Sequence, residues 1–269
     1  MSTVTHFKLA ASSYLNTAPL IWSFLHGSQR DRVELIDAVP ARCSQLLAEG
    51  EVSAALVPII EYQRVSGISL VPDVCVGSKG EVRSVVLVSK CKQLDEVRRI
   101  ALDESSRTSA TLVKIIFFEF LQQNPEWTTH TPNIDLMLAE NDAALIIGDP
   151  AMTFSRDRIN VWDLATVWRN QTGFGFVFAM WMVRDDKLEK TRSVDFAEAR
   201  IEGLSNTEAI VDEYQKRIPL SKSDLRRYIT SNIAFQIDES MDKGLRLYFQ
   251  LAHKHRLIDD VKPLRFTNG

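Results

Sequence analysis

The sequence predicts an α/β protein of two lobes, and three observations support this prediction. Short apolar segments typical of strands alternate with amphipathic segments typical of helices through the first two-thirds of the chain. The alternation starts again after Lys90, which divides the strands into two blocks. No low-complexity linker or internal repeat interrupts the pattern. With 269 residues, the chain is long enough for two lobes of ordinary size.

The first block contains five predicted strands, at residues 7–11, 33–36, 54–57, 68–76 and 82–88. Pro19 lies near the start of the helix that follows the first strand. Pro40 opens the next helix, and Gly50 closes it. A further short helix is expected at residues 59–65, after Pro58.

The second block contains predicted strands at residues 99–102, 130–134, 143–147 and 176–183. An amphipathic helix that includes Leu112 and Phe120 is expected to end before Pro125. A helical turn is expected at 135–140, and residues 161–170 are helical or irregular. From Asp195 to the end the chain is mostly helical, and its longest helical segments are predicted at 198–216 and 238–255.

We expect the strands at 82–88 and 176–183 to be the two crossings between the lobes. On this layout residues 1–88 and 183–269 form the first lobe, and residues 89–182 form the second. Such a layout leaves a cleft between the lobes, which is a common place for the ligand site of an α/β protein.

Composition and charge narrow the range of partners. The net charge of −3 gives no long-range attraction to nucleic acid or to an anionic membrane. No apolar run approaches the roughly 20 residues that span a bilayer, and the N-terminus lacks the pattern of a secretion signal. The three cysteines and five histidines show no metal-binding spacing. We therefore expect a cytoplasmic protein without a metal ion or cofactor, and without nucleic acid or membrane partners.

The polar run from Ser105 to Thr111 is the strongest candidate site. It lies between a predicted strand and a predicted helix. Free backbone N–H groups, hydroxyls and the helix dipole at such a point favour an anion, so the run indicates a ligand with a carboxylate or phosphate. The alternative is an ordinary group of N-cap residues, which is the commoner role of Ser and Thr there.

Other polar stretches also lie where strands are predicted to end or begin. Asn16 and Thr17 offer an amide and a hydroxyl before Pro19, or simply cap that helix. Arg83 and Ser84 could hold a carboxylate at the start of a crossing strand, or could be a solvated side chain and a filler.

Two more stretches complete the candidate set. Gly148 would let the backbone approach a ligand closely, and Asp149 precedes a proline as a helix N-cap does. Gly173 and Phe174 belong to a segment whose aromatic residues could wall a pocket for a flat ring. Alternatively, Phe174, Phe176 and Phe178 alternate on one face of a core strand.

These stretches lack the residues of several enzyme classes. They contain no His, no Cys and no close pair of carboxylates, and the chain has no GxSxG, Walker or GxGxxG motif. This argues against a Ser-His-Asp hydrolase and a metal hydrolase. The available polar groups suit holding an anion better than transferring protons.

Six segments together resemble one family, in matching order from about residue 6 to residue 185. They are YLNTAPL, ALVPIIEY, GEVRSVVLVSK, LDESSRTSATLVK, ALIIGDPA and DLATVWRNQTGFGFVFAMWMVR. The family is that of the chorismate dehydratases of the futalosine pathway of menaquinone biosynthesis. The resemblance implies the type II periplasmic-binding-protein fold, with two α/β lobes around a ligand cleft. The chain departs from the family at Gly175, where the motif TGxPFVFA has a proline.

The resemblance implies a reaction in which chorismate loses water and becomes 3-[(1-carboxyvinyl)oxy]benzoate. The C4 hydroxyl and the C3 proton leave, and the ring becomes aromatic. Chorismate carries two carboxylates, which suits anion sites on opposite walls of a cleft.

The resemblance also suggests roles for the candidate residues. As a hypothesis, Ser106, Thr108 and Ser109 bind one carboxylate, and Ser84 with Arg83 binds from the other lobe. Asn16 bonds near C3 and C4, the substrate's own enolpyruvyl carboxylate takes the proton, and Asp149 is the second candidate for the base. The remaining expected contacts are Thr17, Ser105, Gly148, Gly173 and Phe174.

Three other functions stay open at this point. The chain could be a binding protein for an anionic metabolite, a ligand-sensing module, or the sister 1,4-dihydroxy-6-naphthoate synthase, which shares the fold. The N-terminal motif YLNTAPL favours the dehydratase over that synthase. The amphipathic C-terminal helices serve packing or a homodimer surface.

Overall fold

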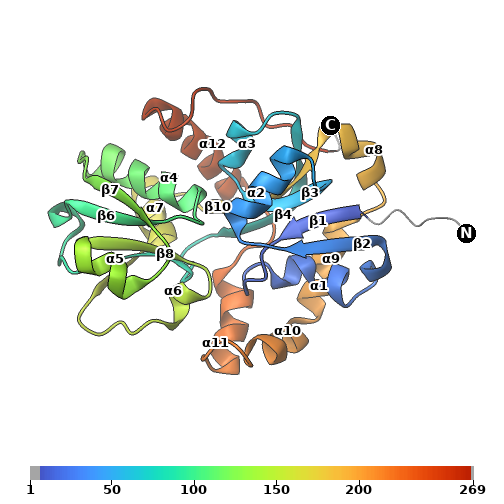
Figure 1. Cartoon of the computed structure of the whole chain (residues 1–269), viewed down its shortest axis with the longest axis horizontal. Helices are drawn as coiled ribbons and strands as arrows, with labels where there is room; N and C mark the ends of the chain where they lie inside the picture. The colour runs from blue at the N-terminus through green and yellow to red at the C-terminus, as the bar shows by residue number, and fades with distance from the viewer. Residues whose placement is uncertain (1–6, 268–269) are drawn as a thin grey trace, which may run out of the picture.

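Two five-stranded sheets lie at opposite ends of the molecule, which the computed structural model describes from residue 7 to residue 267 (Figure 1). The first sheet has the order β2-β1-β3-β10-β4 and the second has the order β7-β6-β8-β5-β9. The strands of the first are β1 (Phe7–Ala11), β2 (Val33–Asp37), β3 (Ala54–Pro58), β4 (Ile68–Ser78) and β10 (Phe176–Arg184). Those of the second are β5 (Val85–Ser89), β6 (Arg99–Asp103), β7 (Glu126–His130), β8 (Ala143–Ile147) and β9 (Asn160–Asp163).

Each sheet combines parallel and antiparallel pairs in the same way. β1 runs parallel to β2 and β3, and β6 runs parallel to β7 and β8. Parallel neighbours need crossover connections, which helices supply in both lobes. β10 is antiparallel to β3 and β4, and β5 is antiparallel to β8 and β9. We call the first sheet with its helices the first lobe, and the second sheet with its helices the second lobe.

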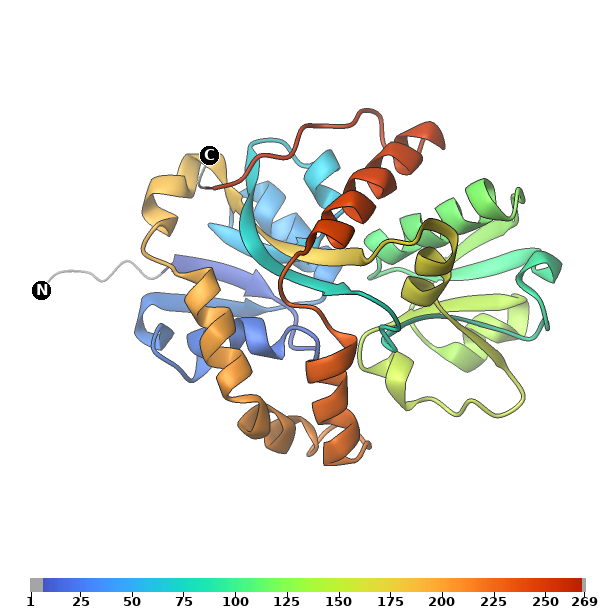
Figure 2. The ribbon, with the colours of Figure 1, turned by 180° about the vertical axis from the view of Figure 1, so that it is seen from behind.

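The helices cover the sheets and connect the lobes. α1 packs against α9, and α12 contacts both β10 of the first lobe and α4 of the second (Figure 2). The helices are α1 (Ala18–Leu25), α2 (Pro40–Glu49), α3 (Glu61–Arg64), α4 (Thr108–Ile115), α5 (Ile134–Glu140), α6 (Pro150–Thr153), α7 (Leu164–Thr172), α8 (Leu188–Thr191), α9 (Phe196–Ser205), α10 (Thr207–Tyr214), α11 (Lys222–Arg227) and α12 (Glu239–Lys254). Two π-helical turns, at Ile116–Phe120 and Tyr228–Asn232, continue α4 and α11.

The strand pairing corrects the expected crossings. β5 was expected within the first lobe and β10 largely within the second, but each belongs to the other sheet. The chain therefore passes between the sheets in the segment 79–84 and again in the segment 173–175. The expected boundaries, at 88/89 and 182/183, fall one strand too late at both places. The local apolar pattern finds a strand, but it does not say which sheet the strand joins.

Several element boundaries also differ from expectation. β7 ends at His130, where a strand was expected to begin. Residues 161–170 divide into β9 and α7, because Asp163 caps α7 with its side chain. The long helix expected at 198–216 is two helices, which meet at Asn206. The helix that opens at Pro40 and closes at Gly50 is confirmed, and Gly50 adopts the left-handed conformation with φ 76°.

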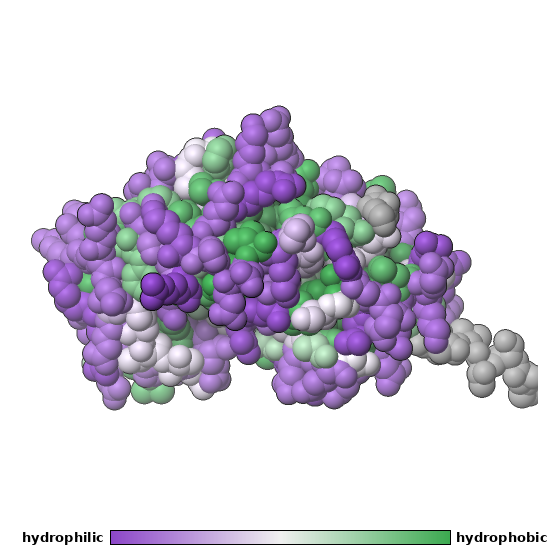
Figure 3. Space-filling view, turned by 90° about the horizontal axis from the view of Figure 1, so that it is seen from above, coloured by the Kyte–Doolittle hydropathy of each residue, from purple (hydrophilic) through white to green (hydrophobic). Residues whose placement is uncertain are grey.

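One hydrophobic core runs through both lobes. Side chains of β5 alternate, with Val85 and Leu87 in this core and Val86 and Val88 in a smaller cluster on the other face of the second sheet. The surface seen in Figure 3 is mainly hydrophilic, with apolar residues in small groups. Within residues 7–267, no helix is both long and apolar enough to cross a membrane.

Aromatic side chains join the lobes beside the second crossing. Trp168 of α7 lies 5.4 Å from Phe176 of β10, and Tyr248 of α12 lies 5.1 Å from Phe176, measured between ring centroids. The rings meet edge to face, the favourable geometry for aromatic pairs. The region of this crossing is therefore tightly packed.

Candidate active site

A cleft lies between the lobes, at the carboxyl ends of parallel strands from both sheets. The residues that follow β1, β6 and β8 line it together, as expected for an open α/β sheet. Its empty space is about 550 Å³, a figure that includes the open mouth. The first lobe contributes Ser12, Tyr14, Asn16, Thr17, Pro40, Leu56, Pro58, Val76, Phe178 and Ala179, and the second contributes Val85, Ser105, Ser106, Arg107, Thr108, Ser109, Ile147 and Gly148.

The polar run lines one wall of the cleft, at the N-terminus of α4. The helix begins at Thr108, and no side chain caps it at Arg107. The ordinary capping alternative is therefore wrong for this helix, whose first N–H groups are left for another partner. Ser106, Thr108 and Ser109 are buried beside this end of the helix. The wall can hold an anion by hydroxyls, backbone N–H groups and the helix dipole.

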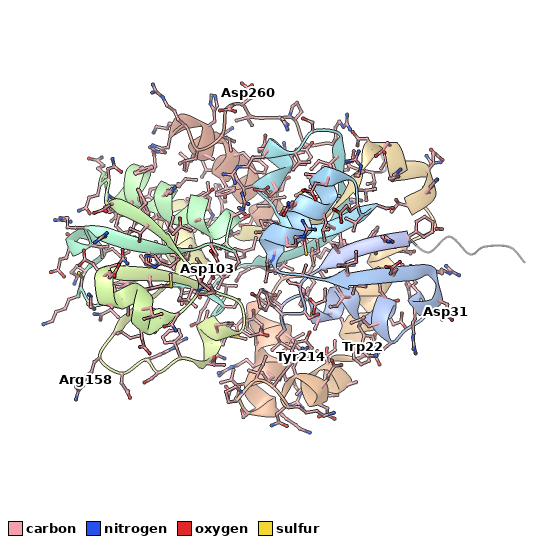
Figure 4. The ribbon with its side chains drawn as sticks, viewed as in Figure 1. Trp22, Asp31, Asp103, Arg158, Tyr214 and Asp260 are labelled. Carbon is pink, nitrogen blue, oxygen red and sulfur yellow. The ribbon has the colours of Figure 1, made fainter. Side chains whose placement is uncertain are left out.

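Two hydroxyls of the run also have structural partners. Ser105 donates its hydroxyl to Asp103 Oδ1 at 2.6 Å, and the Ser105 backbone N–H donates to the same oxygen at 2.8 Å. Asp103 lies at the end of β6 and is labelled in Figure 4. Burial raises the pKa of Asp103, and the bonds from Ser105 oppose the rise. Thr108 Oγ1 accepts from the Ile60 N–H at 3.3 Å, so its own O–H can still donate to a ligand.

The loop after β1 forms the opposite wall. Thr17 occupies the N-cap position of α1, but its side chain does not cap the helix. Its hydroxyl instead donates to the backbone carbonyls of Ser12 and Tyr14, the latter at 2.8 Å. These bonds fold the loop so that the Asn16 side chain lines the cleft. Asn16 Oδ1 is buried and has no hydrogen-bond partner in the described part of the chain. A buried acceptor without a partner costs free energy, so this oxygen is available to a ligand.

The turn after β8 meets that loop. Gly148 has φ 70°, and a Cβ on it would lie 3.1 Å from the Tyr14 ring. Asp149 occupies the N-cap position of α6 without making a side-chain cap, so the predicted capping is wrong. Its Oδ1 instead accepts from the Leu15 N–H at 3.0 Å.

The surroundings of Asp149 and Tyr14 set their protonation. Burial raises the pKa of Asp149 to about 6, against the opposing effects of the Leu15 N–H and the Arg217 charge. Burial also raises the pKa of Tyr14, with further increases from Asp103 and Asp149. Tyr14 is therefore a hydrogen-bond donor at neutral pH. Asp149 is not among the residues that line the cleft.

Four predicted contact residues, Arg83, Ser84, Gly173 and Phe174, do not line the cleft. Ser84 is fully buried and accepts from the Tyr228 hydroxyl at 2.6 Å, and Arg83 has φ 63° and lies 4.0 Å from Asp224. The backbone N–H groups of Val82 and Arg83 both donate to Asp163 Oδ2. These bonds fix the first crossing between the lobes.

The aromatic segment also differs from expectation. Gly173 is the left-handed C-cap of α7, and Phe174 packs against α12 at Gly244. Neither lines the cleft, whereas Phe178 of β10 does. Phe178 was predicted only as a core residue, because alternation along a strand does not say which end of the sheet a ligand meets.

A family model described as menaquinone biosynthesis matches residues 7–254. The chain belongs to this family. A chorismate dehydratase of Thermus thermophilus is 28% identical over 261 residues, which cover 90% of this chain and 93% of that protein.

Solved structures confirm the periplasmic-binding-protein fold predicted for this family member. A protein of Archaeoglobus fulgidus superposes with a TM-score of 0.77 at 16% identity, over 96% of this chain and 100% of the other. A Candida albicans protein described as having the generic periplasmic binding protein fold superposes with a TM-score of 0.64 at 12% identity, over 96% and 92%. The aliphatic sulphonate binding protein of Escherichia coli gives a TM-score of 0.62 at 13% identity, over 97% and 93%.

Two residues that line the cleft were not predicted from the sequence as site residues. Arg107 is exposed where the polar run meets the cleft, and among residues 7–267 it is the one cationic side chain that lines the site. Tyr14 adds a hydroxyl to the opposite wall. Both belong to stretches that were identified, so their proximity to Ser106 and Asn16 was the available signal.

Gly175 packs closely against α12. The Gly175 N–H donates a hydrogen bond to Ser240 Oγ at 3.0 Å. A Cβ at this position would lie 2.7 Å from Met241 Cγ, which is too close for an unstrained contact. We expect Gly175→Pro to lower the free energy of unfolding by roughly 2–3 kcal/mol, since it removes this bond and overpacks the contact. Urea denaturation measures the change. Gly175→Ala keeps the N–H and separates the two effects, and a proline variant as stable as the parent would contradict the prediction.

Proposed function

We propose that this protein dehydrates chorismate to 3-[(1-carboxyvinyl)oxy]benzoate, as a hydro-lyase of the futalosine route to menaquinone. Membership of the menaquinone-biosynthesis family and the likeness to a chorismate dehydratase support the proposal. The observation that carries it is the pairing of two features across the cleft. The uncapped N-terminus of α4 faces the loop on which Asn16 offers a buried, unpaired amide oxygen.

The α4 wall is proposed to hold a substrate carboxylate. Ser106, Thr108 and Ser109 would donate hydrogen bonds, and the helix dipole would favour the negative charge. Arg107 would bind the second carboxylate by a charge-assisted pair at the mouth. Apolar side chains such as Leu56, Val76 and Phe178 would contact the ring between these polar groups.

Asn16 is proposed to act at the leaving hydroxyl. Its amide oxygen would accept from the C4 hydroxyl and fix the orientation of the C4–O bond. No His, Cys, Lys, Asp or Glu is among the residues that line the cleft in the described part of the chain. The enolpyruvyl carboxylate of the substrate would therefore take the C3 proton.

The electron balance of this route is simple. The electron pair of the C3–H bond becomes the C3–C4 π bond, and the C4–O bond breaks. The departing hydroxide receives the proton that the enolpyruvyl carboxylate has taken from C3, and it leaves as water. Because the ring becomes aromatic, the protein mainly positions the substrate and stabilises charge.

The test is to mix purified protein with chorismate and follow the ultraviolet spectrum. Replacement of the cyclohexadiene absorption by that of a substituted benzoate, confirmed by mass spectrometry, is expected. Binding of chorismate without conversion would contradict the proposal and favour a sensor or carrier. Turnover of a cyclic futalosine with no action on chorismate would favour the sister synthase.

The location and assembly of the protein belong to the same proposal. We place it in the cytoplasm, which the three free cysteines, Cys43, Cys75 and Cys91, support. Chorismate is its proposed small-molecule partner. The homodimer suggested by the amphipathic C-terminal helices stays a prediction, which analytical ultracentrifugation tests.

Arg107→Ala is expected to raise the KM for chorismate about tenfold with a smaller change in kcat, because a charge-assisted hydrogen bond to one carboxylate is lost. Steady-state kinetics measures both constants. Arg156→Ala is the matched control, since Arg156 is an exposed arginine of the second lobe outside the cleft. Equal effects of the two substitutions would show that only the overall charge matters.

A further inference from the structure

A hydrogen bond joins the two lobes beside the cleft, next to Asn16. The Leu15 N–H of the first lobe donates to Asp149 Oδ1 of the second lobe at 3.0 Å. The two residues lie 134 positions apart in the sequence, so only the assembled pair of lobes brings them together. Leu15 itself is fully buried, and it directly precedes Asn16.

The other bonds of this loop come from its own side of the cleft. Ser13 donates its N–H to Asp37 Oδ1 at 3.0 Å, and the Tyr214 hydroxyl donates to the Ser13 carbonyl at 3.1 Å. Asp37 ends β2, and Tyr214 ends α10, where Figure 4 labels it. These bonds fix the start of the loop. The Asp149 carboxyl holds it one residue before Asn16.

Van der Waals contact strengthens the same junction. The Tyr14 ring lies directly against the backbone of Gly148, where no Cβ separates them. Gly148 in turn donates its N–H to the Ser84 carbonyl at 2.8 Å, at the first crossing between the lobes. The turn that carries Asp149 is therefore anchored to the second lobe on one side and to the Asn16 loop on the other.

We propose that Asp149 is a positioning residue, which sets the place of Asn16 by accepting the Leu15 N–H when the lobes are together. The kinetic consequence rests on the proposed function, whereas the contact does not. This positioning role replaces the one that the sequence suggested for Asp149, that of second candidate for the base. An oxygen acceptor suffices for positioning, whereas a base must take a proton.

The chain offers a pair of substitutions that separates these roles. Asp149→Asn keeps an amide oxygen for the Leu15 N–H but cannot act as a base. Asp149→Ala removes the acceptor. If Asp149 positions the loop, the asparagine variant keeps kcat within about threefold of the parent, and the alanine variant loses about 30-fold. Loss of turnover in both variants, with chorismate still bound, would overturn the proposal and make Asp149 the base.

Hydrogen exchange of the Leu15 amide tests the contact without any substrate. Exchange should be slow in the parent and in Asp149→Asn, and about tenfold faster in Asp149→Ala. The Ile59 amide, which donates to the Phe178 carbonyl at 2.9 Å, should stay slow in every variant and shows that each one is folded. Tyr214→Phe is the matched control, because it removes a bond to the same loop from the first-lobe side. Equal protection of Leu15 in the parent and in Asp149→Ala would overturn the proposal.

A double-mutant cycle shows whether Asp149 acts through Asn16. The variant Asn16→Ala/Asp149→Ala is expected to be no more than about twofold slower than Asn16→Ala alone, because the residue being positioned is already absent. Multiplying effects would overturn the positioning role. If the parent protein does not convert chorismate, the proposed function fails, and the Leu15 exchange rates still decide the contact.

Discussion

Asn16→Ala lowers kcat for chorismate by about 100- to 1,000-fold in our expectation, with a smaller change in the affinity for the substrate. The magnitude is typical of a polar group that meets the reacting atoms in a water-poor site. Its structural reason is the buried Oδ1 atom, which has no partner in the described part of the chain and lies in the cleft wall. Alanine removes that oxygen and leaves the helix N-terminus opposite unchanged. Initial rates measured from the ultraviolet spectrum give kcat, and calorimetric titration gives the affinity.

Ser13→Ala is the control for this substitution. Ser13 lies in the same loop, and its hydrogen bonds to Asp37 and Tyr214 use only backbone atoms of Ser13. The control variant should turn over chorismate at close to the parent rate. Near-normal turnover in Asn16→Ala would remove Asn16 from the mechanism, and comparable losses in both variants would point to general damage of the loop.

The second large effect concerns stability and pH at Asp149. Its pKa of about 6 in the folded protein lies above the ordinary 3.8, because burial disfavours the charged form. The protonated carboxyl therefore stabilises the fold fully below about pH 4, and this contribution is lost as the pH rises to 6. Asp149→Asn is neutral at every pH. The variant should gain about 2–3 kcal/mol relative to the parent between pH 4 and pH 7, with no further gain above that range.

Urea denaturation of both proteins across this pH range measures the difference. Asp157→Asn, which changes an exposed carboxyl of the same lobe, serves as the control. A difference between the parent and Asp149→Asn that does not change with pH would contradict the assignment of the raised pKa to Asp149. A parent that becomes relatively more stable as the pH rises would reverse its sign.

Local patterns predicted much of the fold. The apolar runs of β1, β3 and β8 are buried along most of their length. A run of consecutive apolar residues is therefore enough to predict a buried strand there. Pro40 and Gly50 likewise mark a helix by local geometry alone. The assignment of β5 and β10 to their sheets depends on pairing between distant segments. No local pattern carries that information, and the lobe boundaries were displaced for this reason.

The candidate site divides in the same way. Asn16 and the Ser106–Ser109 stretch were predicted because strand ends and helix starts are visible in the sequence, and the structure places them on facing walls. Ser84 does not line the cleft, because its hydroxyl accepts a hydrogen bond from Tyr228, a residue far away in the sequence. The bond from Leu15 to Asp149 was also invisible, since the N-cap position of Asp149 suggested a local partner. Contacts between the lobes decide these residues.

The place of β10 in the first sheet has a consequence for how the chain is made. β10 lies between β3 and β4, yet it follows the whole second lobe in the sequence. On the ribosome, β5 to β9 therefore emerge as one uninterrupted set, while the first lobe waits for its central strand. The later lobe is the first whose sheet can be completed. Until β10 is synthesised, β3 and β4 expose unpaired edges, which other chains could pair with.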